Sequence, residues 1–150
     1  MKRIYVASSW RNSLQAQVVA ALREASHEVY DFRNPAPGEH GFAWSEVDPD
    51  WRKWTPPKFT VNLYRGHPAV VRGYGFDKAA LEKCDTCVCV LPCGRSAHLE
   101  AGYAIGKGKL VIFLLQPEGF EPELMYLLGT DCVCSIEELL GLLEMCEGKG

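Results

Sequence analysis

The stretch VLPCGRSAHLEAGYAIGKGKLVIFLL, from Val90 to Leu115, contains two apolar runs joined by a short polar loop and a segment of helical composition. The first run completes the strand-like segment TCVCVL over 86–91, and the second reads as a strand over 110–115. Two apolar strands around a helix are typical of a parallel sheet that is buried on both faces. One acidic residue, Glu100, lies where the loop gives way to the helix.

The same alternation of strands and helices continues on both sides of this stretch. Apolar runs predict further strands over 4–7, 27–32 and 132–134. Helical spacing of apolar residues predicts helices from 12 or 13 to about 26, over 77–84, 96–106 and 136–145, and a short one near 123–128. The sequence therefore predicts an α/β fold with a doubly wound, five-stranded parallel sheet of the flavodoxin-like or Rossmann-like type, with helices on both faces.

The region from about residue 34 to residue 76 has no clear periodicity. It is rich in proline and aromatic residues and contains Trp44, Trp51 and Trp54, three of the four tryptophans. Loops of this length inside a compact domain are usually lids or binding loops. We therefore expect a single domain over 1–150 with a long, aromatic-rich substrate loop at about 34–76, partly helical near 45–53.

Composition limits the class of protein. A chain of 150 residues with 47% hydrophobic residues can bury one core, and a net charge of −3 without a basic block argues against nucleic-acid polymers as partners. No apolar run approaches the roughly 20 residues that span a bilayer. The amino terminus leads directly into a strand pattern, and the seven cysteines are an odd number. These features predict a cytoplasmic protein that binds small molecules and no membrane.

The cysteine-rich run CDTCVCVLPC raises the question of a metal site. Cys87 and Cys89 are two residues apart on a strand and therefore share one face, and Cys132 and Cys134 repeat this spacing. A structural zinc site usually takes its ligands from two paired knuckles on turns. We expect buried free thiols, no metal and no cofactor.

The residues around Glu100 predict a ligand site. In doubly wound sheets, ligands bind beyond the carboxyl ends of the strands, where the segments 7–11 and 92–96 and the aromatic-rich loop are expected. With Ser96 as the helix cap, Glu100 falls in the first full turn, and the positive end of the helix favours an ionised, nucleophilic carboxylate. Satisfying the helix dipole explains the residue equally well. Polar Arg95 and Ser96, with Gly94 to admit a ligand near the backbone, favour a site.

Several motifs resemble the nucleoside 2-deoxyribosyltransferase superfamily, which includes the 2′-deoxynucleoside 5′-phosphate N-hydrolases. They are Tyr5 in RIYVASSW, Asp77 in GFDKAALEKCD, the block GRSAHLEAGYAIGKGK, and EPELM. The resemblance implies an enzyme in which Glu100 attacks C1′ of a nucleoside or nucleotide, forms a glycosyl-enzyme ester and passes the sugar to another base. It also implies that Tyr5 orients Glu100 and that Asp77 delivers a proton to the leaving base.

Each implied role has a structural alternative. Tyr5 is also explained as a core aromatic residue, and Asp77 as a helix N-cap. The position six residues before the nucleophile is usually Asp in the transferases and Ser in the phosphate hydrolases, whereas here it is Gly94. This departure leaves open hydrolysis of a 5′-monophosphate, or a nucleotide-binding domain without catalysis.

The remaining expected contacts concern the phosphate, the base and the subunit interface. Arg95, Ser96 and the amides at the helix start are candidates for a 5′-phosphate site, together with Ser8, Ser9 and Arg11, which are equally explained as a turn and cap. Phe42 or Trp44 is expected to contact the base, although the loop aromatics also suit a small satellite core. The resemblance implies a homo-oligomer, a dimer or larger, with Met125 near the shared pocket; Met125 also suits a core position.

Overall fold

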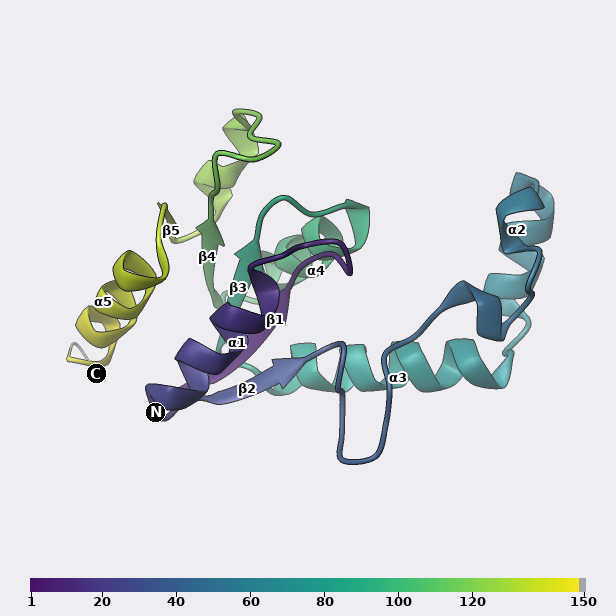
Figure 1. The fold of residues 1–150 in the computed structure, drawn as a ribbon, viewed down its shortest axis with the longest axis horizontal. Coiled ribbons are helices and arrows are strands. Elements are labelled where there is room, and N and C mark those ends of the chain that lie inside the picture. Colours follow the sequence, from purple (N-terminus) through teal and green to yellow (C-terminus); the bar gives the residue numbers. More distant parts are fainter. Residues whose placement is uncertain (149–150) are drawn as a thin grey trace. The chain divides into compact units, whose positions relative to one another are not determined.

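The structure is a computed structural model that describes residues 1–148, and it contains two compact units (Figure 1). The sheet unit comprises residues 1–31 and 83–148, and the helical unit comprises residues 32–82. Among residues 1–148, no helix combines the length and apolar character that a bilayer span requires.

The sheet unit confirms the predicted fold class. Five parallel strands occur in the order β2-β1-β3-β4-β5, so the strand order reverses between β1 and β3. The strands are β1 (Arg3–Ala7), β2 (Glu28–Asp31), β3 (Thr86–Val90), β4 (Leu110–Leu114) and β5 (Asp131–Val133). All five predicted strands are present, with ends that shift by at most one residue.

Helices cover both faces of this sheet. They are α1 (Gln15–Glu24), α4 (Arg95–Gly106) and α5 (Ile136–Glu147), with a short 3-10 helix η3 (Leu124–Leu128). Helices α1 and α5 pack on one face, and α4 packs on β1, β3 and β4 from the other side (Figure 1). Asn12 lies just before α1, and its side-chain Oδ1 accepts the backbone N–H groups of the N-cap Leu14 and the first helical residue Gln15. Glu123 and Ser135 are the N-caps of η3 and α5, and their side chains accept the backbone N–H groups of Met125 and Glu138.

Alternation along the strands divides the buried side chains between the two faces. The core shared with α1 and α5 is aliphatic and includes Val6, Val88 and Ile112. Successive side chains of a strand point to opposite faces, so Tyr5, Cys87 and Cys89 face α4. That helix turns only small residues, Ala97, Ala101 and Ala104, toward the interior, which lets it lie close to the sheet.

The helical unit corrects the prediction of a long loop, although the helical segments expected near 45–53 are present. It contains two 3-10 helices, η1 (Trp44–Glu46) and η2 (Trp51–Lys53), followed by α2 (Pro56–Tyr64) and α3 (Pro68–Lys83). Proline at the first helical position starts both α-helices, because its missing N–H is not needed there. Gly73 and Gly75, which weaken the helical pattern in the sequence, both lie inside α3.

Aromatic side chains form the interior of the helical unit. Trp44 makes edge-to-face contacts with Phe42, Trp54 and Phe59, with ring centroids 4.8, 5.7 and 5.8 Å apart. The indole N–H of Trp54 donates to Asp48 at 2.7 Å. These contacts agree with the satellite-core interpretation, and the expected contact of Phe42 or Trp44 with a base stays a prediction.

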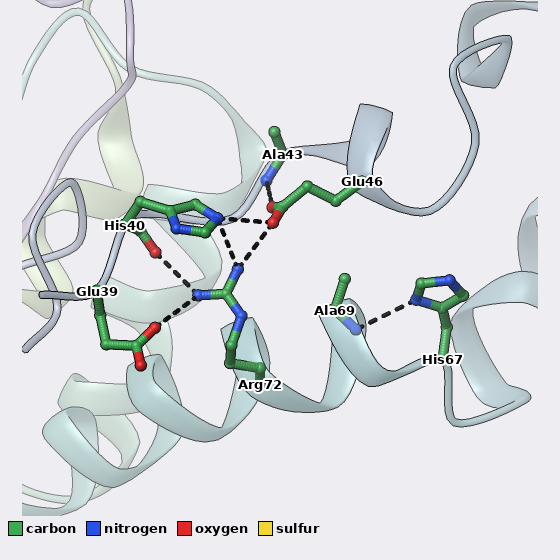
Figure 2. A network of polar contacts seen from close by, with 7 residues as sticks. All are labelled: Glu39, His40, Ala43, Glu46, His67, Ala69 and Arg72. Carbon is green, nitrogen blue, oxygen red and sulfur yellow. Dashed lines mark hydrogen bonds and ion pairs between the residues drawn. The ribbon is translucent and has the colours of Figure 1, made fainter.

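A polar clasp ties residues 39–46 to α3 (Figure 2). Arg72 donates to the carboxylates of Glu39 and Glu46, at 3.3 and 3.0 Å, and to the backbone oxygen of His40 at 3.0 Å. The Nε2 atom of His40 lies 2.7 Å from Glu46 and 3.2 Å from the Arg72 guanidinium. A carboxylate accepts and a guanidinium only donates, so the shorter contact identifies Nε2 as a donor to Glu46.

Candidate functional site

The switch point of the sheet lies between the carboxyl ends of β1 and β3. The two loops that leave these strands are connected by side chains of the first loop. The Ser8 hydroxyl donates to the Val90 carbonyl at 2.8 Å, and the buried Asn12 amide donates to the carbonyls of Pro92 and Val90 at 3.1 and 3.4 Å. The β3–α4 loop is thereby fixed beside the position where doubly wound folds bind ligands.

The start of α4 differs from the prediction by two residues. Gly94 is the N-cap, and Ser96 is the second helical residue rather than the cap. Gly94 has φ −93° and ψ −159°, which other residues also adopt, and it makes no side-chain cap bond. Arg95 and Ser96 are exposed beside the first-turn N–H groups. This arrangement can accept an anion.

Glu100 is consequently the sixth residue of α4 and lies in its second turn. The dipole effect falls off within the first turn, so the expected support from the helix start is weaker than the sequence suggested. The side chain is partly buried. Burial raises the pKa of the Cys87 thiol well above its usual value, and the charge of Glu100 adds to this increase. The charge of the Glu100 carboxylate is therefore felt on the side of the sheet that faces α4, where Cys87 lies.

Tyr5 lies on the same side of the sheet. Its side chain is fully buried, its strand position pairs with Cys87, and its ring stacks on Tyr30 with centroids 5.1 Å apart. Tyr5 and Glu100 thus belong to the layer between the sheet and α4. The core interpretation of Tyr5 is confirmed by its burial, and its role in orienting Glu100 stays a prediction that can hold at the same time.

Asp77 does not begin a helix. It is the tenth residue of the 16-residue helix α3, so its interpretation as an N-cap is wrong. The helix starts at Pro68, where His67 Nδ1 accepts the backbone N–H of Ala69 at 3.2 Å. Asp77 belongs to the helical unit and Glu100 to the sheet unit, so proton delivery by Asp77 stays a prediction.

In the loop that follows β1, the hydrogen bonds of Ser8 and Ser9 support their interpretation as turn residues. The Ser9 hydroxyl oxygen accepts the backbone N–H of Arg11 at 3.2 Å, and the Ser8 proton is used in the bond to Val90. The Arg11 side chain is exposed. Contact between Ser8, Ser9 and Arg11 and a phosphate stays a prediction. To donate a hydrogen bond to the phosphate, the Ser8 hydroxyl would have to give up its bond to the Val90 carbonyl.

A pocket of about 510 Å³ occupies the other side of α4. Its walls come from the β3–α4 loop, α4, β4, the loop over 115–123 and η3. They include Cys93, His98, Gly102, Phe113, Met125 and Tyr126. Glu100 is not in the lining, because the α4 residues that line the pocket are roughly 100–160° away from it around the helix axis. Met125 is 55% exposed, so its interpretation as a core residue is wrong.

His98 and Tyr126 join α4 to η3 at this pocket. His98 Nδ1 donates to the Gly94 carbonyl at 2.8 Å, which leaves Nε2 to accept the Tyr126 hydroxyl at 2.9 Å. Burial raises the pKa of Tyr126 to about 12, so the phenol stays a donor. The Tyr126 ring also stacks on Phe113 with centroids 4.2 Å apart. Sequence patterns did not identify this pair, because its members are 28 positions apart.

In the sheet unit, the candidate chemical groups are the Glu100 carboxylate in the second turn of α4 and the exposed first turn of the same helix, which suits an anion. Within residues 1–148, no group of three or more His, Cys, Asp or Glu side chains is arranged to hold a metal ion. All seven cysteines are free thiols, and Cys84, Cys87 and Cys89 are buried.

Comparison with known proteins gives matches at the level of structure. No family model and no curated protein matches the sequence. A CMP N-glycosidase from Clostridium botulinum is 18% identical, with a TM-score of 0.51 over 95% of this chain and 99% of the other. A 2-deoxyribosyltransferase from Bacillus psychrosaccharolyticus is 17% identical, with a TM-score of 0.56 over 91% and 89%.

A third solved structure, a conserved protein from Enterococcus faecalis V583, is 16% identical, with a TM-score of 0.59 over 97% of this chain and 98% of the other. At these identities the three structures show a shared fold, which confirms the predicted fold class. Two of them, by their names a CMP N-glycosidase and a 2-deoxyribosyltransferase, share it with this chain over nearly its whole length.

Proposed function

We propose that this chain, whose fold is that of the nucleoside 2-deoxyribosyltransferase superfamily, cleaves the N-glycosidic bond of deoxynucleosides or deoxynucleotides and transfers the sugar to another base. The observation that carries the proposal is the position of Glu100 on α4, behind the switch point, in a fold shared with a CMP N-glycosidase and a 2-deoxyribosyltransferase. Fold alone does not fix function, so the proposal depends on the chemistry of this carboxylate.

The reaction needs two displacements at C1′. The Glu100 carboxylate attacks C1′, the bond from C1′ to the base nitrogen breaks, and its electron pair stays on the base, which takes up a proton. A nitrogen of a second base then attacks C1′, gives up its proton to the Asp77 carboxylate and releases Glu100, so two inversions give retention. In this scheme Tyr5 orients the carboxylate, and Asp77 supplies the proton to the leaving base.

The decisive experiment compares Glu100→Gln with Glu144→Gln. Glu144 is an exposed residue of α5 and provides a matched control for the loss of one carboxylate. Purified protein is incubated with deoxynucleosides and their 5′-monophosphates, with and without free bases, and the products are separated by chromatography. We expect Glu144→Gln to keep full activity and Glu100→Gln to lose activity by at least about 10³-fold, since a nucleophile is removed.

Two results would contradict this proposal. Equal activity of the two variants would exclude Glu100 as the nucleophile. Tight binding of a nucleotide that stays intact after long incubation, measured by calorimetry, would instead support a binding domain without catalysis.

Hydrolysis of a 5′-monophosphate is the second candidate, and the start of α4 favours it. Arg95 and Ser96 are exposed there, next to first-turn amides that suit a phosphate. A Cβ added at Gly94 meets no atom within 4 Å, so this position can accept a larger residue. Water would then replace the second base in resolving the glycosyl ester.

Substitutions at Gly94 distinguish the two candidates. Gly94→Ser adds a hydroxyl that can donate to phosphate, and Gly94→Asp adds a charge that repels it. If the substrate carries a phosphate at this position, we expect KM for the monophosphate to fall several-fold in the first variant and to rise at least about tenfold in the second. Gly106→Ser, also in open space on α4, is the control. Equal changes of KM in all three variants would show that the substrate phosphate does not lie at this position.

A further inference from the structure

Two thiols lie in contact at the junction of β3 and its following loop. Cys89 Sγ, on the central strand β3, is 3.6 Å from Cys93 Sγ in the loop that leads to α4. Cys89 is fully buried, whereas Cys93 is partly buried and lines the 510 Å³ pocket. A small solute that enters the pocket therefore reaches Cys93 before it reaches Cys89.

The environment makes the two thiols unequal. The hydrogen bond from Cys89 lowers the pKa of Cys93, although burial and the charge of Glu100 oppose this effect. The same bond, together with burial, raises the pKa of Cys89 well above its usual value. Because the thiolate is the reactive form, oxidation is expected to begin at Cys93.

The other thiols near this strand have less reactive environments. Burial raises the pKa of Cys84 and of Cys87. Cys132 is exposed, and partial burial, followed by the charges of Asp131 and Cys134, raises its pKa. The Cys89–Cys93 pair thus combines a lowered thiol pKa, access from a pocket and a second sulfur in contact.

We propose that Cys93 is a peroxide-sensitive modification site and that Cys89 is its resolving partner. The Cys93 thiolate attacks the distal oxygen of a hydroperoxide, the O–O bond breaks, and the products are Cys93 sulfenic acid and an alcohol or water. The Cys89 sulfur then attacks Cys93 and expels the hydroxyl, which leaves as water. The two thiols lose two electrons, and the hydroperoxide gains them.

The second step is favoured by the geometry of the pair. Oxidation of Cys93 removes the thiol interaction that is the largest cause of the raised Cys89 pKa. The contact of 3.6 Å makes the reaction intramolecular and close to attacking distance. A disulfide has an S–S length of about 2.05 Å, so the sulfurs must approach by roughly 1.5 Å. Since β3 is paired on both sides, the loop that carries Cys93 makes this movement and takes a wall of the pocket with it.

The experiment maps oxidised thiols in the intact chain, without any assumption about enzyme activity. The protein is treated with hydrogen peroxide, free thiols are blocked with N-ethylmaleimide, and oxidised thiols are then reduced and labelled with iodoacetamide. Trypsin releases residues 84–95, which contain Cys84, Cys87, Cys89 and Cys93, and tandem mass spectrometry locates each label. We expect Cys89 and Cys93 to carry the second label in at least about tenfold excess over Cys84 and Cys87.

Three variants test the order of the steps. In Cys89→Ser, Cys93 should stop at the sulfenic acid, which dimedone traps. In Cys93→Ser, Cys89 should stay reduced, and Cys134→Ser, which removes an exposed thiol, should change neither result. The proposal is wrong if the wild-type chain oxidises Cys132 or Cys134 while Cys89 and Cys93 stay reduced, or if Cys89 is oxidised as readily in Cys93→Ser. The wild-type map decides the matter even if a variant fails to fold.

Discussion

The sheet unit and the helical unit are stabilised in different ways. The sheet unit buries aliphatic side chains almost completely, with Ile112 and Leu114 both at 0% exposure. Within residues 32–82, Leu81, at 6% exposure, is the most deeply buried large apolar side chain, and the remaining interior consists of partly buried aromatic side chains and the Arg72 clasp. Apolar burial responds little to pH or salt, whereas exposed ion pairs respond to both. The helical unit should therefore be the less stable and more condition-dependent part of the chain.

The largest expected effect is in the sheet core. Leu114→Ala removes a fully buried side chain and should lower the free energy of unfolding by about 3 kcal/mol, because it leaves a cavity between the sheet and its helices. Leu127→Ala makes the same substitution at 83% exposure and should change it by less than about 0.5 kcal/mol. Urea unfolding followed by far-ultraviolet circular dichroism measures both. Similar losses in the two variants would show that burial does not dominate this unit.

The second effect concerns two glycines of α3 that should respond with opposite signs. A Cβ at Gly73 would lie 2.7 Å from the Phe42 Cβ, whereas a Cβ at Gly75 meets no atom within 4 Å. Gly73→Ala should therefore destabilise by about 1–3 kcal/mol, as Phe42 is displaced from Trp44. Gly75→Ala should stabilise by about 0.5–1 kcal/mol through helix propensity.

Tryptophan fluorescence during urea unfolding measures these changes, since three of the four tryptophans lie in the helical unit. The Gly73→Ala spectrum should also shift, because Trp44 contacts Phe42 directly. If both Gly73→Ala and Gly75→Ala stabilise the protein, Phe42 can move aside for the added methyl group at no net cost in free energy.

The two units also differ in how far the sequence predicted them. Strands such as Thr86–Val90 and Leu110–Leu114 were predicted because continuous apolar runs are a local signal of buried parallel strands. The start of α4 was displaced from Gly94 to Ser96, since both residue types occur as caps and only tertiary structure selects one. Because of this shift, the prediction placed Glu100 in the first turn of α4, whereas it lies in the second turn.

The helical unit was predicted poorly because its structure depends on contacts distant in sequence. Gly73 looks like a helix breaker, yet it sits in α3 where Phe42, 31 positions away by number, leaves no room for a side chain. The pocket has the same origin, since the pairing of His98 with Tyr126 leaves no periodic trace in the sequence. Local patterns therefore singled out Glu100, whose role stays a prediction, and did not identify the cavity on the far side of its helix.

The smallest expected effect is the response of the Arg72 clasp to pH. The hydrogen bond from His40 lowers the pKa of Glu46, and the backbone N–H of Ala43 and the charge of Arg72 act in the same direction. A carboxyl whose pKa is lower in the folded state than its unfolded value near 4.3 stabilises the fold above about pH 5, and this contribution is lost as pH falls through the folded pKa. Because the Glu46 and Arg72 side chains are partly exposed, at 29% and 26%, solvent screens the ion pair and the contribution should stay below about 1 kcal/mol.

Glu46→Gln should therefore weaken the helical unit at pH 7 and flatten its loss of stability between about pH 5 and pH 3, measured by tryptophan fluorescence in urea. Asp48, whose pKa is lowered chiefly by the bond from Trp54, titrates in the same direction and accounts for the slope that remains. Salt at about 1 M should reduce the difference between wild type and variant, as screening weakens the ion pairs with Arg72. Glu144→Gln is the matched control, and an equal flattening there would assign the pH response to overall charge rather than to the clasp.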